Sequence, residues 1–170
     1  QQLPLHIIWL IRIATCSVCL QIILGGWTSA NYAQLICPDF PTCQGSWLPK
    51  MHFSEAFGIA PIGPNYEGGQ LSTAARTAIH YSHRLGGLLA CVIFTSLSLC
   101  CYQVRHTLSA NYLKQLIYII ILFTVQISLG IANIILALPM SIAVMHNICA
   151  LLLLLTLIKL WHMSVYHAPE

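Results

Sequence analysis

The sequence predicts an all-α membrane protein, a bundle of four transmembrane helices with a long loop between the first two. Of its 170 residues, 58% are hydrophobic and only 6% are charged, whereas charged residues make up roughly a quarter of an ordinary soluble domain. The mean hydropathy is +0.77. Four apolar stretches are each longer than the about 20 residues that a helix needs to cross the hydrocarbon of a membrane. A soluble enzyme and a nucleic-acid-binding protein are therefore excluded.

The predicted spans cover about residues 7–30, 76–102, 112–138 and 140–163. The first two are joined by residues 31–73, which are rich in proline and glycine and read as a folded aqueous loop with one short helix near residues 54–57. The other two connections are short. The length fits a single domain over residues 1–170.

The basic residues predict the orientation, because cytoplasmic loops carry an excess of Lys and Arg. Four fall at one end of the predicted bundle and two at the end with the long loop: Arg12, Arg105, Lys114 and Lys159 against Lys50 and Arg76. We therefore expect a multi-pass protein of the bacterial inner membrane with both termini cytoplasmic and the long loop periplasmic. The abrupt start, without Met, suggests a piece of a longer chain.

Two of the eight cysteines stand apart from the others. Six lie in or at the edge of apolar stretches, where free cysteine usually packs as a small hydrophobic side chain. Cys37 and Cys43 instead lie in the polar loop, six positions apart, with two prolines between them that favour a turning chain. On the oxidising side of the membrane we expect them to form a disulfide. A structural staple and a redox-active pair both remain open.

A short motif repeats between the first and third spans and suggests a pseudo-twofold repeat of helix pairs. Both contain Q-I-x-L-G, beginning at Gln21 and at Gln126. Each copy continues into one polar, small helix face at positions i, i+4 and i+7: Gln21, Gly25 and Thr28 in the first span, and Gln126, Gly130 and Asn133 in the third. Close helix packing through small residues and a flat ligand held against the glycines with amides nearby are both open interpretations.

The second and fourth spans supply histidines. His80 and His83 share one helix face with Arg76, and His146 lies on the fourth span between small residues. A histidine within a membrane span is costly and is a functional candidate by default. His83 and His146 each lie seven residues inside the outer edge of their span, about 10 Å deep.

Equal depth on antiparallel helices suits one metal held from opposite sides. Zinc would require four ligands, usually with thiolate or carboxylate, and only His80 and Cys149 are nearby. A bis-histidine haem requires only His83 and His146, with small residues for the ring and cations for its propionates. Arg76 and Arg84 are the cations expected at the outer rim, and His80 is expected to support the site without ligating the iron.

Three motifs together resemble haem A synthase: C-P-D-F-P-T-C at residues 37–43, A-R-T-A-I-H-Y-S-H-R at residues 75–84 and L-P-x-x-x-A-x-x-H-N at residues 138–147. The resemblance implies a family with eight transmembrane helices in two similar four-helix halves. Each half has a haem site between paired histidines and an outer loop that can carry a cysteine pair. The implied activity is conversion of haem O to haem A, by oxidation of a ring methyl group to a formyl group.

One position departs from the half that binds the substrate haem. That half has a glutamate three residues before the ligand, where this sequence has His80. The chain therefore resembles the carboxy-terminal half, which implies a cofactor haem b here and haem O in a partner half. The implied partners are haem, the lipid bilayer, an amino-terminal half or a second copy of the chain, haem O synthase and a periplasmic thiol-redox protein.

Two further classes of function remain open. A cytochrome b-like electron-transfer subunit would share the four helices and both ligands, but it has no need of the cysteine pair. A haem-free assembly scaffold would lack the optical spectrum of a haem protein.

Overall fold

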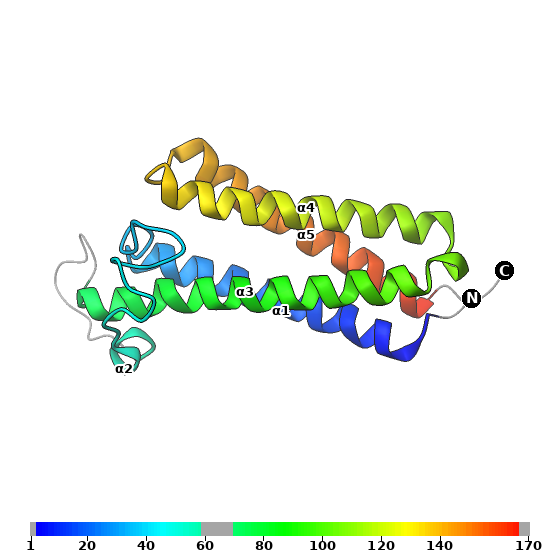
Figure 1. Cartoon of the computed structure of the whole chain (residues 1–170), viewed down its shortest axis with the longest axis horizontal. Coiled ribbons are helices and arrows are strands. Elements are labelled where there is room, and N and C mark those ends of the chain that lie inside the picture. The colour runs from blue at the N-terminus through cyan, green and yellow to red at the C-terminus, as the bar shows by residue number, and fades with distance from the viewer. Residues whose placement is uncertain (1–2, 59–69, 167–170) are drawn as a thin grey trace.

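The computed structural model describes residues 3–58 and 70–166. Within these residues the chain forms four long helices, α1 (Leu5–Ala30), α3 (Thr73–Gln103), α4 (Ala110–Ile135) and α5 (Met140–Tyr166). A single-turn helix, α2 (Phe53–Ala56), lies in the long loop, and a 3₁₀ turn, η1 (Arg105–Thr107), follows α3. The long helices form an antiparallel bundle with the loop at one end (Figure 1). The described residues form no strand, so the predicted fold class is confirmed.

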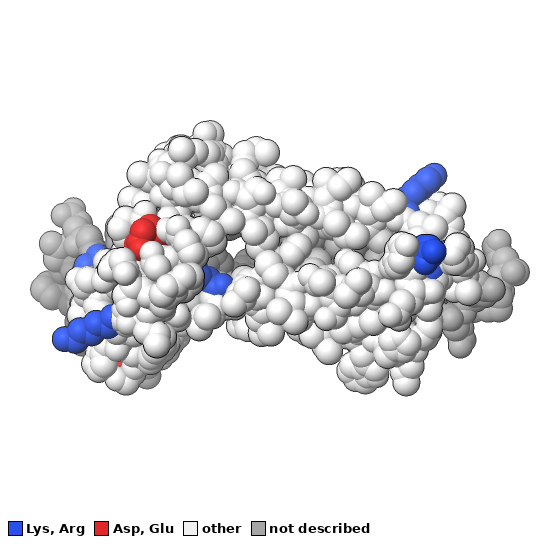
Figure 2. All heavy atoms as spheres, in the orientation of Figure 1, with Lys and Arg blue, Asp and Glu red and all other residues white. Residues whose placement is uncertain are grey.

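All four long helices are long and apolar enough to cross a membrane. Their 26 to 31 residues correspond to about 39 to 46 Å of helix, which exceeds the roughly 30 Å of hydrocarbon. Figure 2 shows the Lys and Arg side chains toward the two ends of the visible face, with a long uncharged surface between them. The large apolar side chains exposed along the helices, such as Leu88, Val92 and Leu99, are suited to contact lipid.

The helices pack as two pairs, α1 with α3 and α4 with α5, and α1 also packs along α5 (Figure 1). The main apolar core fills the end of the bundle away from the loop. Toward the loop end the fully buried residues of this core stop at Val18, Ala90, Leu122 and Cys149 on the four helices, and the partly buried Leu129 packs against them from beyond this limit. A stacked ring pair, Phe94 on α3 and Phe123 on α4 with centroids 4.0 Å apart, lies close to this limit. The loop end of the bundle is consequently packed less tightly between the two pairs.

Two helix ends in the structure differ from the ends predicted for the spans. α3 begins at Thr73 rather than near residue 76, because the Ser72 hydroxyl accepts a hydrogen bond from the Ala75 amide (3.2 Å) and caps the helix. α4 ends at Ile135 rather than at residue 138. There the chain turns through Ala137 and Leu138, whose φ angles are +55° and +64°, values that are uncommon for residues with a Cβ atom.

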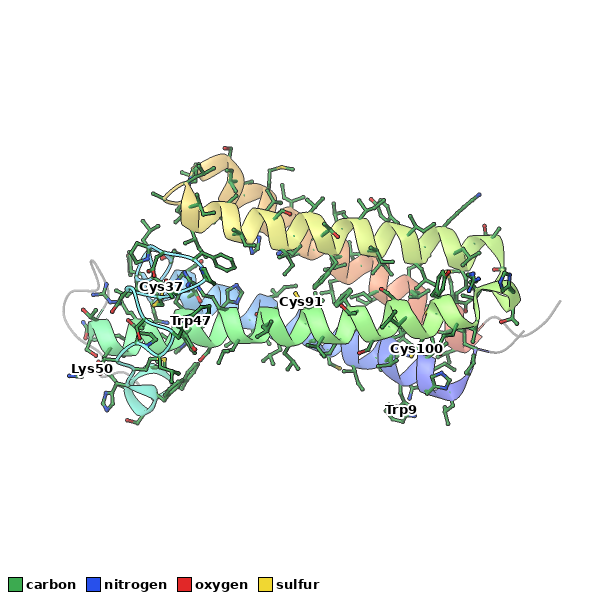
Figure 3. The ribbon with its side chains drawn as sticks, in the orientation of Figure 1. Trp9, Cys37, Trp47, Lys50, Cys91 and Cys100 are labelled. Carbon is green, nitrogen blue, oxygen red and sulfur yellow. A yellow bond between two sulfur atoms is a disulfide. The ribbon has the colours of Figure 1, made fainter. Side chains whose placement is uncertain are left out.

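The long loop is folded onto the ends of α1 and α3. α2 confirms the expected short helix, and the Trp27 indole of α1 donates to the Ala56 carbonyl oxygen (3.0 Å). A second small apolar cluster lies beneath the loop: Ala33, Ala56, Leu71, Ala75, Ala78 and Ile79. Figure 3 shows Cys37, Trp47 and Lys50 at the loop end, Trp9 at the opposite end and Cys91 between them. Residues 59–69 of the predicted loop lie outside the described residues.

Candidate functional site

Each of the two candidate ligands packs directly on a glycine of its paired helix. A Cβ atom added at Gly25 of α1 would lie 3.4 Å from His83 Cε1 and 3.9 Å from its Nε2. A Cβ atom added at Gly130 of α4 would lie 3.1 Å from His146 Cε1 and 3.7 Å from its Nδ1. Both glycines end the repeated Q-I-x-L-G motif, so the repeat gives two equivalent histidine–glycine contacts.

The glutamines of the repeat also reach the histidines. Gln21 Nε2 donates to the His83 carbonyl oxygen (3.2 Å), and Gly86 makes room for it, because a Cβ there would lie 2.6 Å from Gln21 Nε2. Gln126 Nε2 lies 3.2 Å from His146 Nε2. Each glutamine, one turn before the glycine of its motif, therefore contacts the histidine of the paired helix. Gln21 contacts the backbone of His83, and Gln126 contacts the ring of His146.

Several buried polar atoms around these contacts have no hydrogen-bond partner. They are His83 Nδ1, His146 Nδ1, Gln21 Oε1, Gln126 Oε1 and Asn133 Oδ1. An unsatisfied buried polar atom costs about 1–3 kcal/mol, and such a group calls for an explanation such as a catalytic or ligand-binding role. Five of them on facing helices fit a binding site better than a packing surface.

The two histidine pairs lie at the same, loosely packed end of the bundle. Figure 2 shows the surface hollowed between the two helix pairs toward the loop end. The main apolar core has no fully buried side chain in this region, and only the partly buried Leu129, next to Gly130, packs against the core from here. In each helix pair an imidazole, an amide and a glycine therefore lie together toward the loop end of the bundle.

The other two candidate zinc ligands have different partners. His80 is buried, and its Nδ1 lies 2.8 Å from the Ala33 carbonyl oxygen at the start of the loop. The Cys149 thiol donates to the Leu122 carbonyl oxygen (3.4 Å). Within residues 3–58 and 70–166, no three His, Cys, Asp or Glu side chains come together as a metal site. A two-histidine site fits this donor set better than tetrahedral zinc does.

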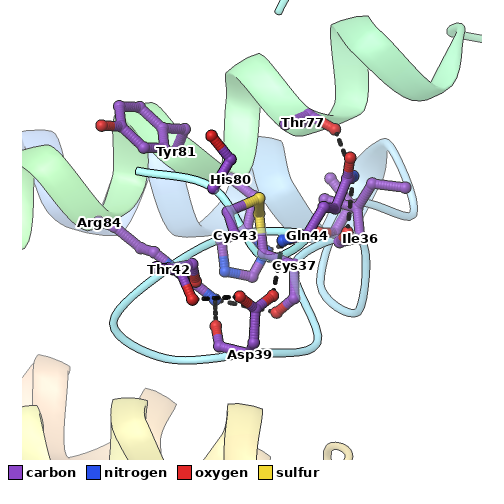
Figure 4. The surroundings of a disulfide bond; sticks show 12 residues. Ile36, Cys37, Asp39, Thr42, Cys43, Gln44, Thr77, His80, Tyr81 and Arg84 are labelled. Carbon is purple, nitrogen blue, oxygen red and sulfur yellow. Dashed lines mark hydrogen bonds between the residues drawn. A yellow bond between two sulfur atoms is a disulfide. The ribbon is translucent and has the colours of Figure 1, made fainter. Parts of the chain in front are cut away.

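Arg84 anchors the loop to α3. Its Nη1 donates to the Thr42 carbonyl oxygen (2.6 Å), and its Nη2 donates to those of Cys37 and Asp39 (both 2.9 Å) (Figure 4). Both terminal nitrogens of Arg84 thus bind the loop. Since Arg84 directly follows His83, the loop is held one residue away from a candidate ligand.

A disulfide joins Cys37 and Cys43, with their Cα atoms 4.6 Å apart, as expected. We call residues 36–47 the disulfide loop. Inside it, the Asp39 carboxylate accepts hydrogen bonds from the Thr42 hydroxyl and from the backbone amides of Gln44 (2.6 Å) and Gly45 (3.0 Å). These hydrogen bonds, with that of Thr42 foremost, hold the pKa of Asp39 below its usual value.

One face of α3 carries the disulfide loop. The Gln44 side chain donates to the Thr77 hydroxyl (3.0 Å), and the Tyr81 hydroxyl donates to the Trp47 carbonyl oxygen (2.7 Å). Figure 4 shows Thr77, His80 and Arg84 of α3 turned toward the loop. The α3 residues next to His83 therefore form a continuous support for the loop.

Glu55 fixes the start of α3 from the loop. Its carboxylate accepts hydrogen bonds from the Ser72 amide and hydroxyl (both 2.7 Å) and lies 2.9 Å from His52 Nδ1. These contacts, with that of His52 foremost, lower the pKa of Glu55 to about 2. Glu55 is therefore ionised at any physiological pH.

The structure brings the predicted residues into two groups. Gln21 with His83, and Gln126 with His146, form the two histidine contacts, whereas His80 and Arg84 contact the loop. Arg76 lies in the first turn of α3, at the loop end.

Sequence reasoning missed Gly86, Asp39 and Tyr81. The adjacent glycines at 86 and 87 were the one available signal, since neighbouring glycines in a span often allow close helix contact.

Fold and site together define a class: a multi-pass membrane protein in which each of two helix pairs packs one histidine on a glycine toward the same end of the bundle. Residues 1–158 match the family described as cytochrome oxidase assembly protein. The chain belongs to this family.

Three curated relatives are each named haem A synthase. That of Shewanella oneidensis is 41% identical over 150 residues, which cover 85% of this chain and 44% of the relative. Those of Rickettsia prowazekii and Methylobacterium radiotolerans are 26% and 27% identical, covering 79% and 81% of this chain and 36% and 34% of the relatives. The chain thus spans less than half the length of these relatives. No solved structure matches it.

Proposed function

We propose that the chain is the haem-binding half of a haem A synthase and that His83 and His146 are the axial ligands of one haem b. The whole enzyme would oxidise a methyl group of haem O to the formyl group of haem A. The observation that carries this proposal is the pair of equivalent contacts, His83 on Gly25 and His146 on Gly130, at the loosely packed end of the bundle.

The residues present fit such a group. Two imidazoles are a common axial set for haem iron, and both have a buried ring nitrogen without a partner. Each ring packs against a glycine without a side chain between them, and the Gln21 and Gln126 amides contact the same two histidines. Arg76 is a cation at the loop end that can bind a propionate. When bound, haem b would supply one-electron redox chemistry.

His80 supports assignment to the half that does not bind the substrate. At the position where a substrate-binding half would carry a glutamate, this imidazole is buried and bonds the Ala33 carbonyl oxygen. It thereby fixes the loop start relative to His83 one turn away. Such a residue positions a ligand helix and does not take part in oxidation of haem O.

We infer the location and partners from the same features. The chain lies in the bacterial inner membrane with both termini cytoplasmic, and the disulfide loop covers the periplasmic edge of the haem. An amino-terminal half or a second copy of the chain completes the enzyme. Haem O synthase supplies the substrate, and a periplasmic thiol-redox protein exchanges with Cys37 and Cys43 if the disulfide is redox-active.

The test replaces each ligand and records reduced-minus-oxidised spectra of the purified chain. His83→Ala and His146→Ala should each lose the low-spin haem. His106→Ala, which removes an exposed histidine outside the site, should retain it. His80→Ala should retain haem with a shifted spectrum or potential. A normal low-spin haem in both ligand variants would refute the assignment.

The bound haem also needs identification. Haem extracted from the wild-type chain should elute as haem b in reversed-phase chromatography. Bound haem O would contradict the assignment to the non-substrate half and would favour a substrate site. A purified chain that neither contains haem nor takes up added haem would favour the assembly scaffold.

A further inference from the structure

A second candidate site lies at the end of the bundle opposite the histidines. Arg12 of α1 is seven residues inside the start of its helix, about 10 Å along the axis. Its guanidinium carbon lies 4.8 Å from the ring centroid of Trp9 and 5.7 Å from that of Trp161 on α5. The arginine is thus held between two indoles at an apolar helix interface.

An open groove of about 340 Å³ adjoins this arginine. It is lined by Arg12, Ile158, Trp161, His162 and Val165. Basic and aromatic groups form its polar part, while Ile158 and Val165 provide an apolar wall. This composition matches a molecule with an anionic head and a hydrocarbon chain.

The charge of Arg12 has no carboxylate near it in the described chain. The acidic residues within residues 3–58 and 70–166 are Asp39 and Glu55, and both lie in the loop at the other end. The buried Nε of Arg12 has no hydrogen-bond partner. Ionisable groups within membrane spans are costly and almost always paired, so Arg12 calls for an anion from outside the described chain.

We propose that this groove binds the phosphate headgroup of an anionic phospholipid. A guanidinium offers paired N–H donors that match phosphate oxygens, and tryptophans favour the headgroup level of a membrane. Three further basic residues lie at this end, on η1, α4 and α5, and strengthen the attraction to an anionic leaflet: Arg105, Lys114 and Lys159. The acyl chain would lie along Ile158 and Val165.

The test measures thermal unfolding of the purified chain in neutral detergent while phosphatidylglycerol is titrated in. Phosphatidylglycerol should stabilise the wild type. Arg12→Gln should weaken its apparent binding by about tenfold or more, as expected for loss of a charge-assisted hydrogen bond. Lys159→Gln removes an exposed charge from the same end and should weaken binding by at most about fivefold. Arg12→Lys keeps the charge without the guanidinium fork and should fall between wild type and Arg12→Gln.

Two further titrations identify the occupant. Phosphatidylcholine and inorganic phosphate should each stabilise the wild type less than phosphatidylglycerol does. Equal stabilisation by inorganic phosphate would identify a soluble anion and overturn the lipid assignment. Equal stabilisation by phosphatidylcholine would overturn selection for negative charge. Unchanged phosphatidylglycerol binding in both Arg12 variants would overturn the site itself.

Discussion

Replacing Gly130 by alanine tests the haem site at the closer of the two histidine–glycine contacts. The new Cβ would lie 3.1 Å from His146 Cε1, whereas carbon atoms pack best at about 3.5–4.0 Å. The imidazole would have to move by about 0.4 Å or more, and the Gln126 amide 3.2 Å from its Nε2 resists that movement. Overpacking of this kind typically costs about 1–3 kcal/mol. We therefore expect Gly130→Ala to weaken haem binding about tenfold.

Two neighbouring glycines serve as graded controls. A Cβ at Gly25 would lie 3.4 Å from His83 Cε1, and one at Gly26 would meet nothing within 4 Å. Gly25→Ala should therefore weaken haem binding less than about threefold, because little overpacking arises, and Gly26→Ala should not weaken it. All three variants gain similar helix propensity, so their differences report the histidine contacts.

The assay titrates haem into haem-depleted protein and follows the Soret absorbance of the low-spin complex. The expected order of affinity is Gly26→Ala first, then Gly25→Ala, then Gly130→Ala. If Gly130→Ala binds haem as tightly as Gly26→Ala does, His146 is not held against Gly130 in the haem-bound protein. The reasoning from the repeated motif would then be wrong.

Three further predictions concern the loop. Arg84→Gln removes three hydrogen bonds to loop carbonyls and should speed hydrogen exchange in the disulfide loop about tenfold. Lys50→Gln, also in the long loop, should leave this exchange rate unchanged, and equal effects of the two variants would contradict the anchoring role. The pKa of Glu55 is about 2, below its ordinary value of 4.5, so its stabilisation is present above pH 4.5 and is lost as pH falls toward 2. Because the activity of pepsin itself depends on pH, cleavage of the loop in wild type is compared with cleavage in Glu55→Gln at each pH; wild type should be cleaved more slowly at pH 4.5 and at a similar rate near pH 2, and a ratio that stays constant with pH would exclude this role. Mass spectrometry of alkylated, non-reduced protein should recover Cys37 and Cys43 in one linked peptide, and two alkylated thiols would contradict the bond.

The helices of the bundle were predictable because a membrane imposes length and apolarity on each span. Their ends were less predictable. Ser72 extends α3 by a cap that needs only one hydroxyl, and the turn at Ala137 and Leu138 uses left-handed backbone without glycine. Pro139 marks the turn itself, because proline ends a helix, but no glycine signals the left-handed backbone of Ala137 and Leu138, which the surrounding structure must hold in place.

Some contacts of the candidate site were likewise predictable from the sequence, and others were not. The contact faces of Gln21 and Gln126 followed from helical periodicity, because i and i+4 share a face, and the structure brings both residues to histidines. The partners of Arg84 could not be predicted, because they are backbone carbonyls of a loop more than 40 residues away in sequence. A guanidinium seeks oxygen acceptors, but only the folded loop decides which oxygens are in reach.

The even number of long helices in the described chain has a consequence for how such proteins can grow. α1 begins and α5 ends at the same end of the bundle (Figure 1). A tandem duplication of this unit would therefore insert its second copy with the same orientation as the first, without an added span to reset the topology. The Shewanella oneidensis relative, of which the alignment covers 44%, is long enough for two such units. Because the number of long helices is even, a gene duplication can place two copies of this fold in one polypeptide with the same orientation in the membrane.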